Sequence, residues 1–515
     1  MSPDEARHTD PQQRMFLQCA YHAMEDAGIA PRISESRERT AVFAACGIDG
    51  YLIHHLNGGE PLKDSLRPGR IWTAEVGNEK DYIATRVSYQ LDLGGPSYTV
   101  NSACSSGLVA IAQGVEAIRR GDCDVAISGA SSLTFPNLGY LYGDGFVNSM
   151  DGTVRPFDKN ASGTLFGDSV GAVVLKRLSL AQRDRNRIYA IVRGSAITND
   201  GKMKAGYSAP RAEAQARAIR QSMKRASVQS KDVSYVECHA TATKVGDAIE
   251  LRGLRMALGP DANPIVGSVK GNIGHANCAA GLTGFIKTVL CLYHRTLVPT
   301  VHFQELNARI KDKFEVQTKT ETWQGERRFA GVSSFGVGGT NVHVTLACPE
   351  EESASPEVES ATQEELKSSS SKTYLLPLSA KTNEALQRMC DNLARYLQDQ
   401  GKNLKLCDVA RTLQFGREHM KIRVCVTASS IEEAARKFQF YASTSRHIIS
   451  RSSSNVVFLF PGQGTQFPGM GRAMYVNRLH SYCYNISHTH KSNNSHTRNN
   501  ICDRLEHITS RFQKK

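Results

Sequence analysis

Residues 96–130, PSYTVNSACSSGLVAIAQGVEAIRRGDCDVAISGA, place a cysteine between a strand-like run and a helix-like run. The residues up to Val100 alternate as in a β-strand, whereas the apolar residues from Leu108 to Ile118 recur at helical spacing. Cys104 therefore lies at or near a helix N-terminus, where the helix dipole favours a thiolate. We predict a nucleophile with a lowered pKa. The alternative is a core cysteine, because free cysteines are commonly buried.

The composition is that of a large globular protein in a reducing compartment. The chain has 515 residues, is 40% hydrophobic and contains 13 cysteines. The cysteines show no CxxC spacing, which argues against zinc sites and disulfide scaffolds. Neither a signal peptide nor an uninterrupted membrane-spanning apolar run is present. We therefore expect a cytoplasmic protein without a metal site or a membrane partner.

The charge of the chain limits its partners only weakly. The formal net charge is +13, but there are only two tryptophans and no basic run interleaved with aromatic residues. A nucleic-acid partner is therefore not predicted. An acidic carrier protein would suit the same charge, although net charge describes steering and names no partner.

The amino-terminal region begins with a clearly signalled helix. Asp10 is the predicted N-cap, Pro11 occupies the first helical position and Gln13 completes a capping box. The predicted apolar face of this helix carries Met15, Cys19, Ala23 and Ala27.

From this helix to about Leu346, short β-rich runs alternate with helical stretches. The runs are 39–46, 123–130, 172–178, 188–197, 233–240, 263–271 and 341–348. Such alternation predicts an α/β layered fold. No short-period repeat is visible in the sequence.

The composition changes at residues 348–372, where serine, glutamate and proline dominate and a flexible acidic linker is expected. Residues 373–450 then predict a small α/β module. Its expected elements are strands at 374–380 and 422–429, a helix carrying Leu386, Met389, Leu393 and Leu397, and a helix capped by Ser430 and Glu433.

The last part of the chain reads as two segments. Residues 451–475 look like the opening of a further domain, and 476–515 are expected to be a disordered tail because they lack apolar periodicity. The potential metal ligands of the tail are His480, His488, His490, His496, His507, Cys483 and Cys502. Their spacing matches no tetrahedral zinc pattern, so no metal site is predicted there.

Three further segments bring reactive or anion-binding groups to the ends of predicted strands. His239 follows the run VSYVEC, and Lys270 and His275 follow IVGSV in a glycine-rich loop. Phe335 lies in the glycine-rich turn of SSFGVGGTN, where backbone amides could face a developing anion. Each residue alone also fits a structural role, since a lone histidine after a strand is more often structural than catalytic.

Together these segments resemble the β-ketoacyl synthase (ketosynthase) domain of type I polyketide synthases and related fatty acid synthases. The motifs, in family order, are DPQQR (10–14), SACSSG (102–107), RPFDKNASGTLFGD (155–168), NDG (199–201), CHATATKVGDAIE (238–250), KGNIGH (270–275) and SSFGVGGTN (333–341). The resemblance implies a thiolase-like fold with layered α-β-α-β-α architecture over 1–347. It also implies a ketosynthase–acyltransferase linker domain at 373–450 and the start of an acyltransferase domain at 451–475.

The resemblance also implies a reaction and its residues. Cys104 would accept an acyl group from the phosphopantetheine of an acyl carrier protein, and His239 and His275, both neutral, would stabilise the enolate formed by decarboxylation of a malonyl-type carrier thioester. The backbone amides of Cys104 and Phe335 would form the oxyanion hole. Lys270 would order the histidines. The pantetheine arm would bind Thr241 and Thr243. A homodimer is expected, with no bound cofactor and no metal.

Several positions depart from the family pattern. Ala240 and Ala242 replace glycines, which would cost about 1 kcal/mol each if the backbone has a positive φ there. Asn277 removes a possible carboxylate partner of Lys270, and Asn101 and Ser102 replace an Asp-Thr pair. The first core strand of the family, of the type IAIIGMACRFPG, is expected to be missing, as is the acyltransferase nucleophile motif.

Two competing interpretations remain from the sequence. A truncated, non-catalytic fragment of a polyketide synthase would keep the motifs but not the activity. A thiolase-like enzyme acting on free coenzyme A esters is less favoured, because a thiolase normally carries a second active-site cysteine.

Overall fold

The computed structural model describes residues 1–30, 35–56, 70–325, 328–349, 373–444 and 448–449. The predicted acyltransferase opening (451–475) and tail (476–515) lie outside the described residues, as does nearly all of the predicted linker at 348–372. The predicted domain boundaries therefore stay predictions.

The first sheet has four strands, and it contains the strands predicted at 39–46, 123–130 and 172–178. The strands are β1 (Thr40–Cys46), β2 (Ser97–Thr99), β3 (Val125–Ser132) and β4 (Ser169–Lys176). Their order is β2-β1-β3-β4, with β4 antiparallel to β3 and the other pairs parallel. β1 and β3 are buried along their whole length.

The second sheet has five strands. They are β5 (Ile191–Asn199), β6 (Val233–Glu237), β7 (Ile265–Gly267), β10 (Phe329–Phe335) and β11 (Thr340–Ala347). Their order is β5-β11-β10-β6-β7. β11 is antiparallel to both β5 and β10, and β10, β6 and β7 are parallel to one another. The α/β alternation predicted from the sequence is thus confirmed.

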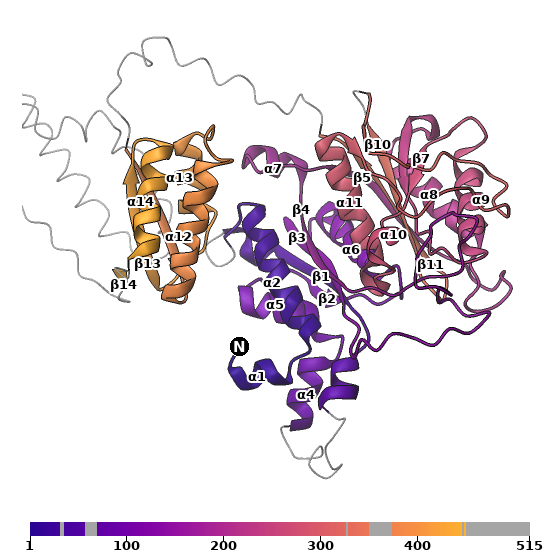
Figure 1. Cartoon of the computed structure of the whole chain (residues 1–515), viewed down its shortest axis with the longest axis horizontal. Helices are drawn as coiled ribbons and strands as arrows, with labels where there is room; N and C mark the ends of the chain where they lie inside the picture. Colours follow the sequence, from indigo (N-terminus) through magenta and orange to yellow (C-terminus); the bar gives the residue numbers. More distant parts are fainter. Residues whose placement is uncertain (31–34, 57–69, 326–327, 350–372, 445–447, 450–515) are drawn as a thin grey trace, which may run out of the picture. The chain divides into compact units, whose positions relative to one another are not determined.

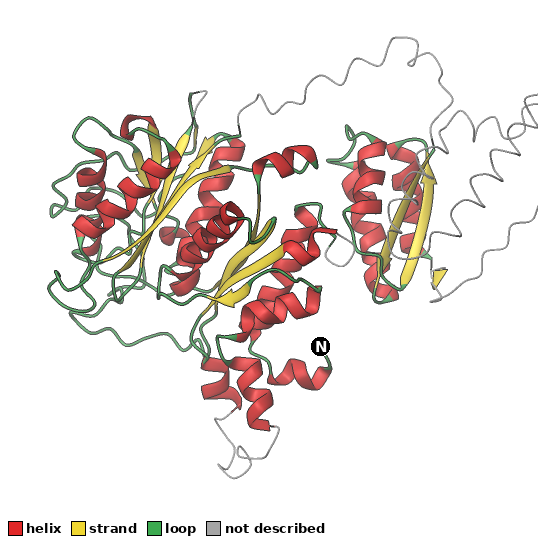
Figure 2. Ribbon diagram, turned by 180° about the vertical axis from the view of Figure 1, so that it is seen from behind, coloured by secondary structure: helices red, strands yellow, loops and turns green. Residues whose placement is uncertain are grey.

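Helices form three layers around the two sheets (Figure 1). α6 (Ser106–Arg120) and α11 (Ala280–His294) lie between the sheets and contact both of them. α2 (Pro11–Asp26) and α5 (Tyr82–Leu91) pack on the first sheet, and α8 (Ala212–Ala226) packs on the second together with α9 (Gly246–Leu258). The view in Figure 2 shows the same order of helices and sheets from behind. The five-layered α-β-α-β-α arrangement expected of a thiolase-like fold is present.

The two halves of this fold are an internal repeat that the sequence does not reveal. The first half runs α2-β1-α5-β2-α6-β3-β4, and the second runs β5-α8-β6-α9-β7-α11-β10-β11. Each element has a counterpart with the same pairing and direction, except that the second half has one more strand, β5, at its start.

The first predicted helix is confirmed, but the predicted capping box is absent, because the Gln13 side chain donates to the Glu79 carbonyl and accepts from Arg86. The buried face of the helix is also not the predicted one. Asp10 caps α2 by accepting a hydrogen bond from the Gln12 amide, and Pro11 begins the helix. The side chains buried in the core are Gln12, Gln13, Phe16, Ala20 and Met24. The bulky Phe16 and Met24 define the buried stripe, whereas Met15 is exposed. The predicted face was therefore wrong by one position.

Shorter elements complete the double-sheet fold. The short α-helices are α1 (Pro3–His8), α4 (Arg70–Asn78), α7 (Leu178–Arg183) and α10 (Lys270–Ile273), and the short strands are β8 (Thr296–Leu297) and β9 (Glu321–Thr322). Among the described residues there are also 3-10 helices at Glu35–Arg39, Ser230–Asp232 and Asn277–Ala279, and a π-helical turn at Leu52–Leu56. No helix in the described part of the chain is both long and apolar enough to cross a membrane.

The second module has its own apolar core. It contains β12 (Tyr374–Ala380), β13 (Ile422–Ala428), β14 (Ile448–Ile449), α12 (Asn383–Gln398), α13 (Leu406–Phe415) and α14 (Ile431–Ser443). The predicted strands and the predicted cap are confirmed, since the Ser430 side chain accepts a hydrogen bond from the Glu433 amide. In α12, Leu386 and Leu397 are buried as predicted, whereas Met389 is exposed because Cys390 and Ala394 complete the buried stripe.

Candidate active site

Cys104 lies in a tight loop between β2 and α6. The preceding Ala103 has a φ of 53°, a left-handed conformation that a non-glycine residue adopts only where its surroundings impose it. The Ser106 hydroxyl accepts a hydrogen bond from the Ser102 amide at 2.8 Å and donates one to the Ala103 carbonyl at 2.6 Å. These bonds hold the loop, and α6 begins two residues after the cysteine, as predicted.

A second anchor joins this loop to the other sheet. The Ser334 hydroxyl of β10 donates a hydrogen bond to the Cys104 carbonyl at 2.9 Å. Beyond it, Gly336 faces the Ser102 carbonyl so closely that a Cβ at this position would lie 2.2 Å from the oxygen. Only glycine permits this approach. The nucleophile loop and the turn after β10 are therefore packed backbone to backbone.

The predicted pKa of Cys104 is wrong in direction. Burial raises the pKa of the Cys104 thiol above its usual range, while the positive charge of Lys270 and hydrogen bonds from the Val337 amide and its own amide lower it. The loss of water contacts outweighs these three stabilising contributions. The thiolate is thus favoured by Lys270 and by backbone amides, but not enough to offset burial.

His239 lies at the end of β6 in a loop held by two buried carboxylates. Glu250 of α9 accepts hydrogen bonds from the amides of His239 and Ala240, each at 2.7 Å. Asp247, one helical turn earlier, accepts from the Ala242 amide at 3.1 Å. Burial raises the pKa of Glu250 to about 7 and that of Asp247 to about 6, although these same amide hydrogen bonds oppose the shift.

The two alanines that replace family glycines do have positive φ angles. Ala240 has a φ of 21° and Ala242 a φ of 59°. The strain expected from the sequence is therefore present. The carboxylates of Glu250 and Asp247 hold the strained segment in place through its amides.

His275 follows α10 and is fixed through its backbone and its ring. Its amide and carbonyl pair with the Leu165 carbonyl and the Gly167 amide, at 2.7 and 3.1 Å. Its Nδ1 accepts a hydrogen bond from the Asn277 amide at 3.1 Å. In a neutral ring the proton then resides on Nε2, which leaves Nε2–H free to donate.

Both imidazoles are neutral at physiological pH, as expected. Burial lowers the pKa of His239 well below its usual range, and the positive charge of Lys270 lowers it further. The same two causes lower the pKa of His275 to about 3. The rings meet edge to face, with centroids 5.4 Å apart.

Lys270 is buried rather than on the surface. Burial lowers its pKa, and the charges of Glu250, Glu237, the Cys104 sulfur and Asp247 raise it. Negative charge near Lys270 is therefore supplied by carboxylates on other elements, although Asn277 carries none. Lys270 is the positive charge around which the thiol, the two histidines and three carboxylates are arranged.

A buried ion pair lies next to the Lys270 loop. Glu237 forms a 2.8 Å ion pair with Lys287 of α11, accepts a 2.6 Å hydrogen bond from the Tyr235 hydroxyl, and accepts a 2.7 Å bond from the Val269 amide. The last bond joins Glu237 directly to the residue before Lys270.

The structure brings the three predicted catalytic side chains together. The sulfur of Cys104 and one nitrogen each of His239 and His275 lie within 4.8 Å of one another. One sulfur and two imidazole nitrogens are also a ligand set that Zn²⁺ accepts. The three loops come from both sheets, so only the folded double-sheet unit assembles the set.

The remaining predicted residues surround this triad. The Phe335 ring packs against the His239 ring, with centroids 5.7 Å apart, and it is the Val337 amide that bonds the Cys104 sulfur. The oxyanion role of the Phe335 amide stays a prediction. Thr241 and Thr243 are half-buried, with hydroxyl oxygens 3.2 Å apart, and Thr243 also accepts a hydrogen bond from the Gly246 amide.

Sequence reasoning missed the residues that support the triad. Glu237, Asp247, Glu250, Lys287, Ser334 and Val337 were not identified. One signal was available, because Asp247 and Glu250 are three residues apart in the sequence, a spacing that places two side chains on one face of a helix. Two carboxylates directly after the His239 loop could have been predicted to accept hydrogen bonds from the backbone amides of that loop.

Comparison with protein families agrees with this architecture. The family model described as "Beta-ketoacyl synthase, N-terminal domain" matches residues 1–181, and "Beta-ketoacyl synthase, C-terminal domain" matches 189–304. A third model, "CurL-like, PKS C-terminal", matches residues 374–438 in the second module.

Curated relatives are large polyketide synthases. The chain is 41% identical over 500 residues to a phenolphthiocerol/phthiocerol polyketide synthase of Mycobacterium tuberculosis, covering 92% of this chain and 33% of the relative. It is 36% identical over 466 residues to polyketide synthase PksL of Bacillus subtilis, covering 86% of this chain and 10% of the relative. The chain thus spans a third or less of these relatives' length.

Solved structures with the same fold are ketosynthases. Ketosynthase twelve of the bacillaene polyketide synthase from Bacillus amyloliquefaciens superposes with a TM-score of 0.76 at 32% identity, covering 86% of this chain and 75% of that chain. The ketosynthase from module 1 of the same organism's bacillaene synthase gives 0.75 at 30% identity, covering 86% and 77%. The chain belongs to the β-ketoacyl synthase family, as a ketosynthase of the polyketide synthase type.

Proposed function

We propose that this chain joins an acyl group to a malonyl-type extender by decarboxylative Claisen condensation, with Cys104 as nucleophile and His239 and His275 as oxyanion donors. The observation that carries the proposal is the convergence of one thiol and two neutral imidazoles within 4.8 Å. A neutral N–H can stabilise a developing oxyanion, and a thiol can hold an acyl group as a thioester.

In the first step, the Cys104 thiolate attacks the carbonyl of an acyl thioester carried on phosphopantetheine. The new S–C bond forms as the carrier's sulfur leaves, and that sulfur takes up a proton. The buried charge of Lys270 favours the thiolate, and the Val337 amide donates to the same sulfur. Thr241 and Thr243 are the proposed contacts of the pantetheine arm.

In the second step, the malonyl thioester loses CO₂ and its electron pair becomes an enolate. The enolate oxygen accepts hydrogen bonds from His239 and His275. His275 is suited to this role because the Asn277 amide occupies its Nδ1 and leaves Nε2–H as the donor. The enolate carbon then attacks the acyl thioester, and the Cys104 thiolate leaves. The amides of Cys104 and Phe335 are the proposed donors to the tetrahedral oxygen.

The proposed partners follow from this chemistry. The substrates arrive on an acyl carrier protein, and no bound cofactor is required by the steps above. The proposed working form is a homodimer, as the family resemblance implies. We place it in the cytoplasm, because a reducing compartment keeps the Cys104 thiol free for acylation.

Acyl transfer to one cysteine tests the proposal. The chain is incubated with an acylated carrier protein, and the mass of the peptide that contains Cys104 is measured. We expect a gain of one acyl group in the wild type and none in Cys104→Ala, with the half-buried Cys19→Ala as the matched control that still acylates. Labelling of a folded chain at another cysteine, or none at all, would overturn the proposal and favour a non-catalytic fragment.

A further inference from the structure

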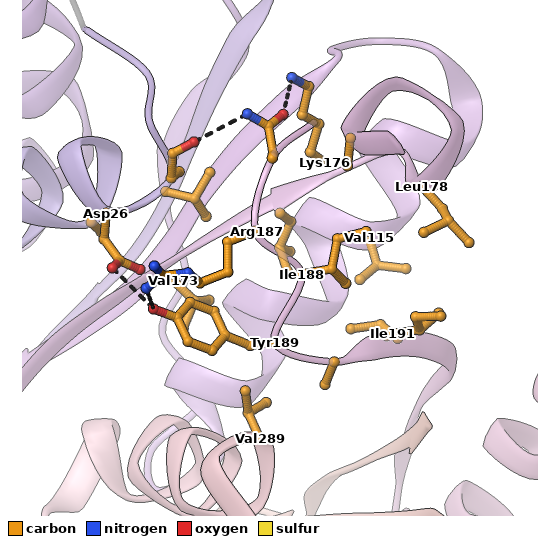
Figure 3. A pocket seen from close by; sticks show the side chains of 18 of the residues that line it. Asp26, Val115, Val173, Lys176, Leu178, Arg187, Ile188, Tyr189, Ile191 and Val289 are labelled. Atoms are coloured by element: carbon orange, nitrogen blue, oxygen red, sulfur yellow. Dashed lines mark hydrogen bonds between the residues drawn. The ribbon is translucent and has the colours of Figure 1, made fainter. Parts of the chain in front are cut away.

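The described residues contain an apolar cavity that lies apart from the catalytic triad. It measures about 580 Å³ and lies beside β4, with Val115, Val173 and Val289 around it (Figure 3). None of the three proposed catalytic side chains lines this cavity. Side chains that act on the triad therefore belong to the contacts of the triad itself.

Four rings form a series of contacts through the triad. Phe166 packs against His275, His275 against His239, and His239 against Phe335, with ring centroids 5.6, 5.4 and 5.7 Å apart. Phe335 is buried, whereas Phe166 is 38% exposed. Phe166 belongs to the motif at 155–168. The series thus ends, on the His275 side, in a residue that has no part in the proposed reaction steps.

The backbone holds Phe166 beside His275. The two residues form a parallel β-bridge, and the His275 amide and carbonyl pair with the Leu165 carbonyl and the Gly167 amide. A Cβ at Gly167 would lie 2.1 Å from the Ile273 carbonyl oxygen, so only glycine permits this close approach. Paired residues of neighbouring strands project their side chains to the same side. The Phe166 ring is therefore fixed next to the imidazole by backbone pairing.

The His275 ring needs more than its hydrogen bond to be held in one plane. The Asn277 amide bonds only Nδ1. A hydrogen bond tolerates a range of angles, so this contact alone leaves the ring free to tilt. Packing restrains the tilt, because the His239 ring meets the imidazole at 89° and the Phe166 ring lies at 40° to it. A tilt would move Nε2–H, the proposed donor, away from the enolate oxygen.

We propose that Phe166 is a positioning residue for His275. Its ring holds the plane of the imidazole, so that Nε2–H points at the enolate oxygen when the malonyl thioester loses CO₂. This role rests on the condensation proposed above. Phe166 acts on decarboxylation through His275 and does not act on the acylation of Cys104.

Removing and restoring the ring tests this role. In Phe166→Ala, CO₂ release from a malonyl carrier thioester by the acylated full chain should slow about tenfold, the size of losing one aromatic pair. Acylation of Cys104 should change less than twofold. Phe166→Tyr, which keeps the ring, should stay within twofold of the wild type in both steps. An unchanged Phe166→Ala, or a Phe166→Tyr as slow as the alanine variant, would overturn the proposal.

Phe135 offers a matched control. It is 40% exposed, and its ring packs against Tyr51 and His55 at 5.6 and 5.9 Å, neither of which belongs to the site. Phe135→Ala should therefore leave both rates unchanged. An equal loss of CO₂ release in Phe135→Ala and Phe166→Ala would contradict a specific role of Phe166.

A double-mutant cycle separates positioning from a merely structural role. Combined with His275→Ala, Phe166→Ala should slow CO₂ release less than twofold, because the ring then has no imidazole to hold. Combined with His239→Ala, it should still slow CO₂ release about tenfold. Equal slowing in the two backgrounds would overturn the proposal, since Phe166 would then act independently of His275.

The same measurements distinguish this role from the proposed function. Chemical denaturation checks that each variant is folded. Where Phe166→Ala is not folded, Phe166→Leu, which keeps most of the side-chain volume but not the ring, takes its place with the same expected results. A wild type that releases CO₂ but shows equal slowing in both backgrounds would contradict only the role of Phe166. A folded wild type that releases no CO₂ would overturn the proposed function, and this role with it.

Discussion

The two sheets of this ketosynthase share one strand order but differ in how they are closed and in what they contribute to the site. The second sheet has five strands and a buried β11, and it delivers His239, His275 and Lys270 from the ends of β6 and β7. The first has four strands and a half-buried β4, and it delivers Cys104 after β2. The groups that stabilise charge thus belong to the better enclosed half, and the nucleophile belongs to the more open one.

This division has a physical reason. Neutral imidazoles and a buried lysine keep their shifted pKa values only in a rigid environment without water, because water would screen the charges that shift these pKa values. The buried carboxylates Glu237, Asp247 and Glu250 all belong to elements of the second half and surround Lys270. The serine bonds around Cys104 hold the nucleophile loop within the first half, while the Ser334 hydroxyl, the charge of Lys270 and the Val337 amide act on it from the second half.

The largest expected effect is a different loss of rate in the two reaction steps when a histidine is replaced. His239→Ala and His275→Ala should each slow malonyl decarboxylation about 10²–10³-fold, the size of losing one oxyanion donor. Each should slow acyl transfer to Cys104 less than about tenfold, because the groups assigned to that step are the Cys104 thiol, the charge of Lys270 and backbone amides, not the imidazoles. Release of CO₂ and acylation of the cysteine are measured separately on the same variants. Equal losses in both steps would contradict the assignment of the two histidines to decarboxylation.

The open edge of the first sheet can be tested with proline. In β11, which pairs on both sides, His343→Pro and Val344→Pro should each lower the free energy of unfolding by about 3 kcal/mol or more relative to the alanine variants. In β4, only one of the adjacent variants Val173→Pro and Val174→Pro should do so, because every second amide points away from β3.

Chemical denaturation of the eight proteins measures these differences, with alanine at each position as the control. If both β4 prolines cost as much as both β11 prolines, the edge of β4 is paired in solution.

The pH dependence should also differ between the halves. Burial raises the pKa of Cys104, so the thiolate fraction grows with pH and acyl transfer should rise about tenfold per pH unit between pH 6 and 8. His275, whose pKa is lowered to about 3 by burial, is already neutral throughout this range, so decarboxylation by the acylated chain should not show this tenfold rise. Glu250 and Asp247, whose pKa values are raised to about 7 and about 6, bond to backbone amides of the His239 loop, so their titration should change this rate less than tenfold over the whole range. Rapid-quench mass spectrometry resolves the two rates. A decarboxylation rate that falls as pH rises would mean that a protonated histidine acts instead.

Local patterns predicted most of the fold and the three central residues of the site. The runs at 39–46, 233–240 and 341–348 became strands because their apolar residues are continuous and bounded by turns. Cys104 was placed before a helix because the apolar spacing changes at Leu108. Such patterns lie within a short stretch of sequence, so the secondary structure that they predict does not depend on contacts with distant residues.

What the sequence did not predict depends on distant contacts. The repeat of the two halves is invisible because pairing order, not residue identity, is repeated. The predicted pKa of Cys104 is wrong because the nearby helix N-terminus can be predicted from the adjacent sequence, whereas the burial that raises this pKa depends on distant parts of the chain. The burial of Lys270 and its approach to Glu237 and Glu250 require two helices and two strands to meet, and no spacing in the chain encodes that.

The smallest predicted effect concerns the strained loop of the second half. Ala242 has a φ of 59°. Ala242→Gly should raise the free energy of unfolding by about 0.5 to 1 kcal/mol, because the cost of the left-handed conformation for alanine exceeds the extra chain entropy that glycine loses on folding. Ala248→Gly, six residues later within α9, is the matched control and should destabilise the chain by about 1 kcal/mol. Asp247 bonds the backbone amide of Ala242, so the glycine variant keeps that bond and should keep its activity. A destabilised Ala242→Gly would mean that the methyl group, buried in the core, contributes more than the backbone strain costs.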